Sequence, residues 1–475
     1  MTSRPVSTPT SMTSVRRRIL HGLGSQGYGQ AVQIVIRLAE VPLLLHFWGV
    51  QLYGEWLMLA AIPAYLAIGD GGFAGAASRD MSMRCGAGDR AGALAVFQST
   101  ACLLCLVSLA VFAIAFVVVP FAPLSDWLGF QQISAGELSF VLLVLVTHVL
   151  VGFQGGLING GFWCSGRYPL GMALAATTQL IEFAAMAAAV ALGGGPVQAA
   201  SAYLAGRVVG TTLTRLALRR ATPWLRYGLA NASVAEIRRL AAPAFASLAF
   251  PLGNALNIQG MRLVVGMVLG PAAVAAFAAL RTLTNFATQP RLIVNRLIEP
   301  ELGVAFGAGN QALFNRLFLR GCQVALWAGI AVALALLLAG PTVWPIWTQG
   351  QVSLSWPLFL ILLAAALINS LWYTALMVPY ATNRHGRIAL IYAGVYGVGA
   401  LALSYLGASI SGLAGAGAGL LVAEMGMACY VLPAALKMAG QHWRAWLSST
   451  LQPPTPILLR AASTTFHALR GKSAR

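Results

Sequence analysis

The sequence predicts an all-α polytopic membrane protein with twelve transmembrane helices in two six-helix lobes, related by pseudo-two-fold symmetry along the membrane normal. Hydrophobic residues make up 58% of the 475 residues and charged residues only 9%, whereas a soluble domain carries about 25% charged residues. Apolar stretches of about 20 residues, the length that crosses a bilayer as a helix, recur twelve times along the chain. Basic residues gather between alternate stretches, and two sequence patterns recur in both halves.

The first six stretches precede a basic loop and the last six follow it. Proline, glycine and asparagine interrupt the seventh stretch between Pro251 and Asn257, so the sequence leaves the boundaries of the seventh and eighth helices open. The expected spans are residues 25–47, 54–78, 93–119, 138–163, 170–193, 199–217, 240–269, 272–297, 316–340, 356–379, 388–406 and 411–436.

Lysine and arginine predict the orientation, because they mark the cytoplasmic loops of membrane proteins. With the N-terminus inside, 26 of the 30 basic residues fall in inner segments and none in the outer loops. Arg291, near the end of the eighth span, is counted among these inner residues. Both termini are therefore expected in the cytoplasm. The net charge of +18 reflects this asymmetry, so nucleic acid is not an expected partner.

The basic loop at residues 218–239 divides the chain into an N-lobe, residues 25–217, and a C-lobe, residues 240–436. Residues 1–24 form a cytoplasmic N-terminal segment, and residues 437–475 form a cytoplasmic amphipathic tail. The pattern GAGD at 86–89 returns as GAGN at 307–310, which favours an internal duplication. Six spans per repeat insert both halves the same way up, and such repeats are typical of transporters with a substrate site at their interface.

Several other functions are disfavoured by what the sequence lacks. No GxxxxGK[ST] motif is present, so the chain is not expected to hydrolyse ATP. The histidines have no spacing typical of a metal site, and the C-x-x-C of Cys102 and Cys105 lies inside an apolar run, where it is interpreted as a packing feature. No cofactor or catalytic residue is expected. The longest outer loop, about residues 120–137, is too short for the catalytic loop of a glycan polymerase or ligase. The protein is therefore not expected to be an enzyme.

Four arginines remain after the 26 basic residues of the inner segments are counted, and these four lie deeper within the predicted spans. Ionisable residues inside a membrane usually face the interior of the helix bundle and mark a substrate path. Arginine also binds phosphate oxygens in a bidentate manner. Arg37, Arg262 and Arg281 are therefore candidate ligands of an anionic substrate, although Arg262 has the alternative of reaching toward the interface. Arg207 is the fourth.

The acids in the spans have a functional and a structural interpretation each. Glu40 stands one turn after Arg37, so the two side chains either pair or share a site. Asp70 either caps a helix break beside Gly71 and Gly72 or binds an ion. Glu182 is a candidate for coupling to a proton or sodium ion. These three acids are the expected charge-modulating or ion-coupling residues.

Arg207 and Glu424 occupy corresponding positions in the sixth and twelfth spans, 217 residues apart. They are expected as an inter-lobe pair, with a lipid-exposed pair or unrelated roles as the alternatives. His148, a further ionisable group in the fourth span, is expected to be a hydrogen-bonded core residue.

Residues 42–82, PLLLHFWGVQLYGEWLMLAAIPAYLAIGDGGFAGAASRDMS, resemble the opening of bacterial polysaccharide transporters, the O-antigen (Wzx-type) flippases. Residues 261–280, MRLVVGMVLGPAAVAAFAAL, resemble the start of their second lobe. The family shares a superfamily with lipid II flippases and multidrug and toxin exporters. The resemblance implies two six-helix lobes around a cavity that opens alternately to either side. It also implies basic residues in the first span and early in the second lobe, where Arg37, Arg262 and Arg281 stand.

The expected function is therefore a flippase of the bacterial inner membrane. Its substrate would be an oligosaccharide linked to undecaprenyl diphosphate, moved by alternating access for exopolysaccharide, capsule or O-antigen assembly. Expected partners are membrane lipids and the polysaccharide polymerase and chain-length machinery. Coupling to a proton, a sodium ion or the membrane potential would drive it. The alternatives are an ion-coupled multidrug exporter and a membrane glycan polymerase or ligase.

Overall fold

The computed structural model describes residues 12–454 apart from Gly71, Ser247 and Asn383. Residues 1–11 of the predicted N-terminal segment and 455–475 of the predicted tail lie outside the described residues. The described part is helical, with 86% helix and no strand within it. The chain forms two compact units, Met1–Pro251 and Leu252–Arg475, which are called the N-lobe and the C-lobe below. The division lies in α9, after the predicted loop 218–239, and the predicted domain limits stay a prediction.

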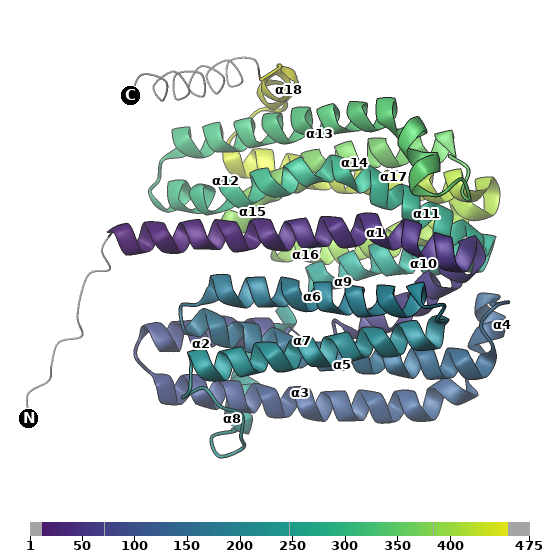
Figure 1. Ribbon diagram of the computed structural model, residues 1–475. Helices are drawn as coiled ribbons and strands as arrows, with labels where there is room; N and C mark the ends of the chain where they lie inside the picture. The colour runs from purple at the N-terminus through teal and green to yellow at the C-terminus, as the bar shows by residue number, and fades with distance from the viewer. Residues whose placement is uncertain (1–11, 71, 247, 383, 455–475) are drawn as a thin grey trace, which may run out of the picture. The chain divides into compact units, whose positions relative to one another are not determined.

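The N-lobe contains eight α-helices within its described residues. The non-helical backbone of Gly49, with φ of 72°, divides the first of them into two spans. Helices α3, α5, α6 and α7 run side by side in Figure 1. The helices are α1 (Met12–Leu66), α2 (Phe73–Gly86), α3 (Arg90–Val118), α4 (Leu124–Leu128), α5 (Ala135–Cys164), α6 (Tyr168–Ala191), α7 (Pro196–Ala221) and α8 (Val234–Ala246).

The C-lobe is built from longer helices broken into shorter pieces. Two of its pieces, η2 (Leu256–Gly260) and η4 (Tyr392–Gly399), are π-helices. A turn of 3₁₀-helix, η3 (Asn285–Thr288), separates two others. The α-helices are α9 (Ala249–Ala255), α10 (Met261–Leu269), α11 (Pro271–Thr284), α12 (Gln289–Gly307), α13 (Gln311–Trp347), α14 (Trp356–Ala375), α15 (Met377–Ala381), α16 (Gly386–Ile391), α17 (Ala400–Ala439) and α18 (Trp443–Leu451).

Each predicted span lies mostly in helical structure within the described residues, and the second span contains a break at residues 67–70. Eight helical stretches of the described chain are long and apolar enough to cross a membrane. Two of these, Gly24–Leu66 and Gly386–Ala439, are 43 and 54 residues long and hold more than one predicted span. The second span is completed by α2, and the sixth and eighth correspond to α7 and to α11 with α12. Helices α7 and α12 each carry more than one arginine, which lowers their hydropathy, and α11 is only 14 residues long.

The two halves share local backbone geometry at the positions that suggested a duplication. Gly49 has φ and ψ of 72° and 179°, and Gly270 has 85° and 168°. Asp89 and Asn310 precede α3 and α13 with φ and ψ of −82° and 78° against −83° and 77°. Each side chain accepts a hydrogen bond from the backbone N–H three residues later. These matches support the internal repeat.

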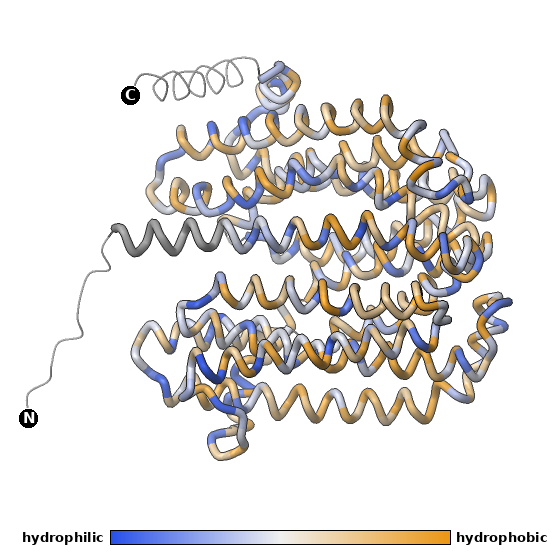
Figure 2. The backbone as a smooth tube through the Cα atoms, viewed as in Figure 1, coloured by the Kyte–Doolittle hydropathy of each residue, from blue (hydrophilic) through white to orange (hydrophobic). Residues whose placement is uncertain are grey.

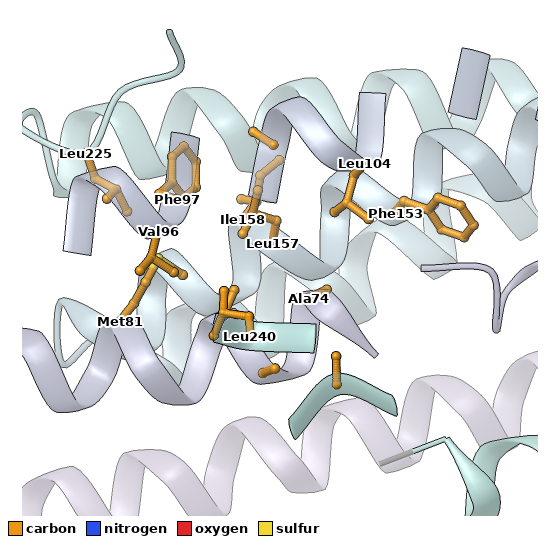
Figure 3. Packing of buried hydrophobic residues seen from close by; sticks show 14 of the residues in the cluster. Ala74, Met81, Val96, Phe97, Leu104, Phe153, Leu157, Ile158, Leu225 and Leu240 are labelled. Atoms are coloured by element: carbon orange, nitrogen blue, oxygen red, sulfur yellow. The ribbon is translucent and has the colours of Figure 1, made fainter. Parts of the chain in front are cut away.

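Hydrophobic residues follow one another along the long helices, and hydrophilic residues are more frequent near the helix ends (Figure 2). In the N-lobe a buried cluster joins α2, α3 and α5, with Phe97, Leu157 and Ile158 near its centre (Figure 3). Leu225 and Leu240, from the segment that follows α7, complete this cluster. The inter-lobe segment is therefore packed onto the N-lobe core.

Glu55 is fully buried in α1 and anchors the loop before α5. Its Oε1 accepts hydrogen bonds from the backbone N–H of Gln131 at 2.8 Å and of Gln132 at 3.1 Å. Its Oε2 accepts from the N–H of Ile133 at 3.0 Å, and the Gln51 side chain donates to Oε1. Hydrogen bonds to an ionised acceptor are stronger than neutral ones. The carboxylate therefore fixes the backbone of the loop before α5, although Gln131 and Gln132 are themselves exposed.

Four charged residues tie α2 to α8. Arg239 donates to both carboxylate oxygens of Asp80, at 2.8 and 2.5 Å. Arg84 donates to Asp80 at 3.0 Å and to Glu236 at 2.9 Å. The Arg239 guanidinium holds the pKa of the Asp80 carboxyl below its usual range. This ion cluster holds α8 against α2.

Replacing Glu55 by glutamine is expected to lower the free energy of unfolding by about 2–4 kcal/mol. The substitution removes the negative charge, and the amide NH₂ group would place a donor where an acceptor of a backbone N–H is needed. Unfolding in detergent, titrated with SDS, measures the change. Glu137→Gln is the matched control, since Glu137 caps a helix at an exposed site and its loss should cost about 1 kcal/mol. Equal losses in the two variants would contradict the anchoring role.

The ion cluster is expected to weaken at acidic pH. Since the pKa of Asp80 is depressed, its contribution to stability is present above the unfolded pKa of about 3.9 and is lost as the pH falls through the folded pKa. The thermal unfolding midpoint of the wild type should therefore fall more steeply between about pH 5 and 3 than that of Asp80→Asn. Asp126→Asn, at an exposed aspartate, should follow the wild type. Parallel curves for wild type and Asp80→Asn would rule this out.

Candidate functional site

A cluster of charged and polar side chains is buried in the middle of the N-lobe. Glu182 on α6 is 1% exposed. Its Oε2 lies 3.2 Å from Nε2 of His148 on α5, and its Oε1 lies 3.1 Å from Nε of Arg207 on α7. The ring of Tyr203, one turn before Arg207, stacks on His148 with centroids 4.1 Å apart. Three helices therefore contribute to one charged cluster.

Two glycines on α7 bring these groups together. A Cβ atom on Gly206 would lie 2.7 Å from Cα of Glu182, and one on Gly210 would lie 2.4 Å from the side chain of Thr178. Their spacing is that of a GxxxG motif, which allows two membrane helices to approach closely. Because Arg207 follows Gly206 directly, this close approach places its guanidinium beside Glu182.

The His148 ring nitrogen Nε2 has two competing partners. Arg207 Nε donates to it at 3.1 Å, and Glu182 Oε2 lies 3.2 Å away. The N–H of Arg207 is aimed at the ring, so Glu182 Oε1 receives no hydrogen bond despite its 3.1 Å distance. One nitrogen cannot accept from arginine and donate to glutamate at the same time. A proton placed on Nε2 would therefore replace the bond to Arg207 by a bond to Glu182.

The remaining N-lobe candidates lie in different surroundings. Glu40 is half-buried and acts electrostatically on Tyr203, which places it near the Glu182 cluster. Arg37, one turn earlier on α1, is exposed. Asp70 lies in the break between α1 and α2, where its Oδ1 accepts a hydrogen bond from the N–H of Gly72 at 2.9 Å. Asp70 thus caps the helix break, and an ion-coupling role for it stays a prediction.

A second buried carboxylate, Glu424 on α17, lies in the C-lobe. It is 3% exposed. Asn369 Nδ2 donates to its Oε2 at 3.0 Å, and Trp372 Nε1 donates to the same atom at 2.7 Å. The Tyr396 hydroxyl is a further hydrogen-bond partner. Glu424 is therefore held by neutral donors, with no arginine bonded directly to it among the described residues.

Arg281 and Arg262 are also held by neutral groups. Arg281 Nη1 donates to the backbone carbonyl of Asn257 at 3.0 Å, and its Nη2 donates to the side-chain oxygen of the same residue. Asn257 in turn donates to the carbonyl of Tyr396 at 3.1 Å. Arg262 donates to Gln259 at 3.1 Å. A chain of hydrogen bonds thus links Arg281 through Asn257 and Tyr396 to Glu424.

This chain crosses both π-helical segments, because Asn257 lies in η2 and Tyr396 in η4. A Cβ atom on Gly253 would lie 2.6 Å from the Tyr392 ring, and one on Gly397 would lie 2.9 Å from Leu256. The two segments therefore pack at close range. Single π-turns within α-helices are frequent at functional sites, and here they present backbone groups to a buried polar network.

Arg207 and Glu424 each have partners within their own lobe. Arg207 contacts Glu182 and His148, whereas Glu424 contacts Asn369 and Trp372. Their pairing between the lobes stays a prediction. Among the residues that the structure describes, no group of three histidine, cysteine, aspartate or glutamate side chains could hold a metal ion.

The sequence-based assignment of Arg291 was wrong. The sequence counts Arg291 among the residues that mark the inner side, but in the structure it is buried in α12 with 8% exposure. Its guanidinium carbon lies 4.1 Å from the centroid of the Tyr373 ring. The signal that could have identified it is its position inside the predicted span 272–297. The neutral donors Asn369 and Trp372 had no comparable signal.

No family model and no curated protein matches the sequence. Solved structures do resemble it. A multidrug resistance MATE family transporter of the MOP superfamily, in an inward-facing conformation, has a TM-score of 0.66 at 18% identity, covering 86% of this chain and 98% of that one. The lipid II flippase MurJ, in an inward closed conformation, has a TM-score of 0.68 at 12% identity, with 91% and 90% covered.

A structure of the MATE multidrug transporter DinF-BH has a TM-score of 0.65 at 13% identity, covering 92% of this chain and 98% of that one. At identities of 12–18%, the similarity to these structures shows the fold alone. The chain therefore has the two-lobe fold of twelve transmembrane helices found in these transporters. The finer relation to Wzx-type flippases stays a prediction.

Arg207→Gln is expected to destabilise the protein by about 1–3 kcal/mol, because it leaves the buried Glu182 carboxylate without its compensating charge, while the partial exposure of Arg207 moderates the loss. The double variant Arg207→Gln with Glu182→Gln should recover part of that loss. Thermal unfolding of the single and double variants in detergent measures the coupling. Strictly additive effects would show that the two groups do not act as a pair.

Proposed function

We propose that the protein is a flippase that moves undecaprenyl-diphosphate-linked oligosaccharide repeat units across the bacterial inner membrane by alternating access, for surface polysaccharide biosynthesis. The fold supports a transporter of this general kind, since the similar structures include a protein described as a lipid II flippase. The polysaccharide substrate rests on the resemblance of residues 42–82 and 261–280 to Wzx-type flippases and on the arginines.

The observation that carries the proposal is the excess of positive charge in the C-lobe. Arg262 and Arg281 are hydrogen-bonded to amide and carbonyl oxygens, and neither forms an ion pair with an acid in the described part of the chain. Glu424, the carboxylate of this network, is occupied by neutral donors. The network therefore keeps a net positive charge, and an anionic group would neutralise it. A diphosphate is such a group, and arginine favours phosphate oxygens.

In this proposal Arg37, Arg262 and Arg281 hold the diphosphate, and Glu40, Asp70 and Glu182 adjust those charges or couple transport to an ion. The competition between Glu182 and Arg207 for His148 supports a proton as the coupling ion. The membrane potential would also help, since it favours outward movement of an anion by about 2.3 kcal/mol per charge per 100 mV. Membrane lipids and the polymerase and chain-length machinery are the proposed partners.

The second candidate is an ion-coupled exporter of small cationic compounds. Likeness to MATE multidrug transporters favours it. A binding site for cations requires exposed acidic groups, however. Glu182 is buried and ion-paired with Arg207, and Glu424 is buried and hydrogen-bonded to neutral donors of the protein. The arginines of the C-lobe would repel a cation. The anionic substrate is therefore the better match to the side chains.

Arg281→Ala is expected to reduce polysaccharide export at least tenfold with normal protein levels, because it removes a guanidinium from the diphosphate site. Export is measured in a strain that lacks the gene and carries the variant on a plasmid. Arg37→Ala tests the first span in the same way, and Arg220→Ala, at an exposed arginine near the end of α7, is the control.

Normal export in both Arg37→Ala and Arg281→Ala would refute the role of these residues. A deletion strain with unchanged surface polysaccharide and raised susceptibility to cationic drugs would refute the flippase and favour the second candidate. Turnover of sugar-lipid substrates by the purified protein would instead identify a polymerase or ligase.

A further inference from the structure

By exposed area, Arg291 is the most completely buried arginine of the described residues. It is 8% exposed, yet its Nε and Nη1 atoms have no hydrogen-bond partner among the described residues. Burying a charged group without its hydrogen bonds carries a large desolvation penalty. The face of the Tyr373 ring, 4.1 Å away, offsets part of that penalty but accepts neither N–H group. Arg291 therefore lacks an acceptor that a ligand could supply.

A second unpartnered atom lies one helical turn away. Asn295 is 5% exposed and its side-chain oxygen has no donor in the described part of the chain, although its amide nitrogen donates to the carbonyl of Tyr373 at 3.4 Å. Residues four apart lie on the same face of a helix. The unpartnered N–H groups of Arg291 and the unpartnered side-chain oxygen of Asn295 thus lie on the same face of α12, and both residues contact Tyr373.

The protein's own carboxylate does not fill this role. Glu424 acts electrostatically on Arg291, but its hydrogen bonds go to Asn369, Trp372 and the Tyr396 hydroxyl. Arg281 also interacts electrostatically with Glu424 and is hydrogen-bonded to Asn257. Two guanidinium groups therefore act on one carboxylate. The two guanidinium groups and the one carboxylate together carry a net positive charge. The N–H groups without an acceptor belong to Arg291.

We propose that Arg291 and Asn295 form a binding subsite of the C-lobe for a phosphate group that carries or adjoins a hydroxyl. A phosphate oxygen would accept from Nε or from Nη1 of Arg291, which lie on different edges of the guanidinium, and the hydroxyl would donate to the Asn295 oxygen. A halide ion would satisfy the arginine but leave the asparagine oxygen without a donor. In its fullest form the inference rests on the proposed function, where this group is the phosphate next to the sugar of the lipid-linked substrate.

The subsite deepens that function because it adds a residue that the sequence counts among the inner residues. Arg281 and Arg291 both interact electrostatically with Glu424. Asn257 accepts hydrogen bonds from Arg281, whereas Nε and Nη1 of Arg291 have no acceptor among the described residues. Arg291 would therefore bind a phosphate more strongly than Arg281, because two of its N–H groups have no competing acceptor.

Binding of inorganic phosphate, glucose 1-phosphate and farnesyl diphosphate to the purified full-length protein in detergent tests the subsite. Calorimetry measures the affinity at fixed ionic strength. Arg291→Lys keeps the positive charge but removes the Nε and Nη1 donors of the guanidinium. It should weaken binding of the phosphate probes at least tenfold. Arg296→Gln, at an exposed arginine on the same helix, is the matched control and should bind as the wild type does. Asn295→Ala should reduce the preference for glucose 1-phosphate over phosphate about threefold or more.

The probes also distinguish the sources of the phosphate. Binding of all three that is lost in Arg291→Lys supports a general phosphate subsite, and loss of farnesyl diphosphate binding alone supports a lipid-borne ligand. Equal affinities in wild type, Arg291→Lys and Arg296→Gln, or no binding of any probe, would overturn the subsite and leave water as the partner of Arg291. Normal export by Arg291→Lys together with lost export by Arg281→Ala would overturn this inference while the proposed function stands.

Discussion

A guanidinium group inside a bilayer must find hydrogen-bond acceptors within the protein or its ligand, because lipid chains offer none. The N-lobe meets this requirement with a carboxylate and an imidazole, which engage Arg207. The C-lobe meets it differently. There Asn257 satisfies Arg281, and Arg291 has an aromatic ring but no acceptor for two of its N–H groups among the described residues. This difference in how the arginines are satisfied separates a closed ionic cluster from a network that can accept an anion.

The two lobes share backbone geometry but not chemistry. The glycines at 49 and 270 and the caps at 89 and 310 have nearly the same dihedral angles. At corresponding positions of the sixth and twelfth spans, however, one lobe has Arg207 and the other Glu424. Each charge has acquired partners from its own lobe. The duplicated scaffold therefore supports two different polar clusters, one with a histidine between an acid and an arginine and one with more arginines than acids.

Hydropathy was sufficient to predict the helices, since a span must be long and apolar whatever its neighbours are. The break at Asp70 was also predictable, because an acid beside two glycines is typical of a capped interruption. The sequence could not predict that Glu55 binds three consecutive backbone N–H groups, because those groups lie more than 70 residues further along the chain. The π-helices also had no sequence signal.

Charged residues near the end of a span were the main source of error. The sequence treats Arg291 as a cytoplasmic residue because arginines cluster there, and hydropathy does not distinguish a snorkelling side chain from one stacked inside the bundle. Burial depends on what the neighbouring helix presents, in this instance Tyr373 of α14. The candidate arginines of the C-lobe were identified, whereas the neutral residues that support them, Asn257, Asn369 and Trp372, became visible only in the fold.

The central claim is that buried arginines select an anionic lipid-linked substrate. The most direct measurement is movement between leaflets in vesicles that contain the purified protein, using a fluorescent polyprenyl diphosphate sugar and an otherwise identical lipid with an uncharged linkage. The account predicts that the protein accelerates transfer of the diphosphate lipid and leaves the uncharged lipid at the rate of empty vesicles. Equal rates for the two lipids, or transport of a small cationic dye with no movement of the diphosphate lipid, would contradict it.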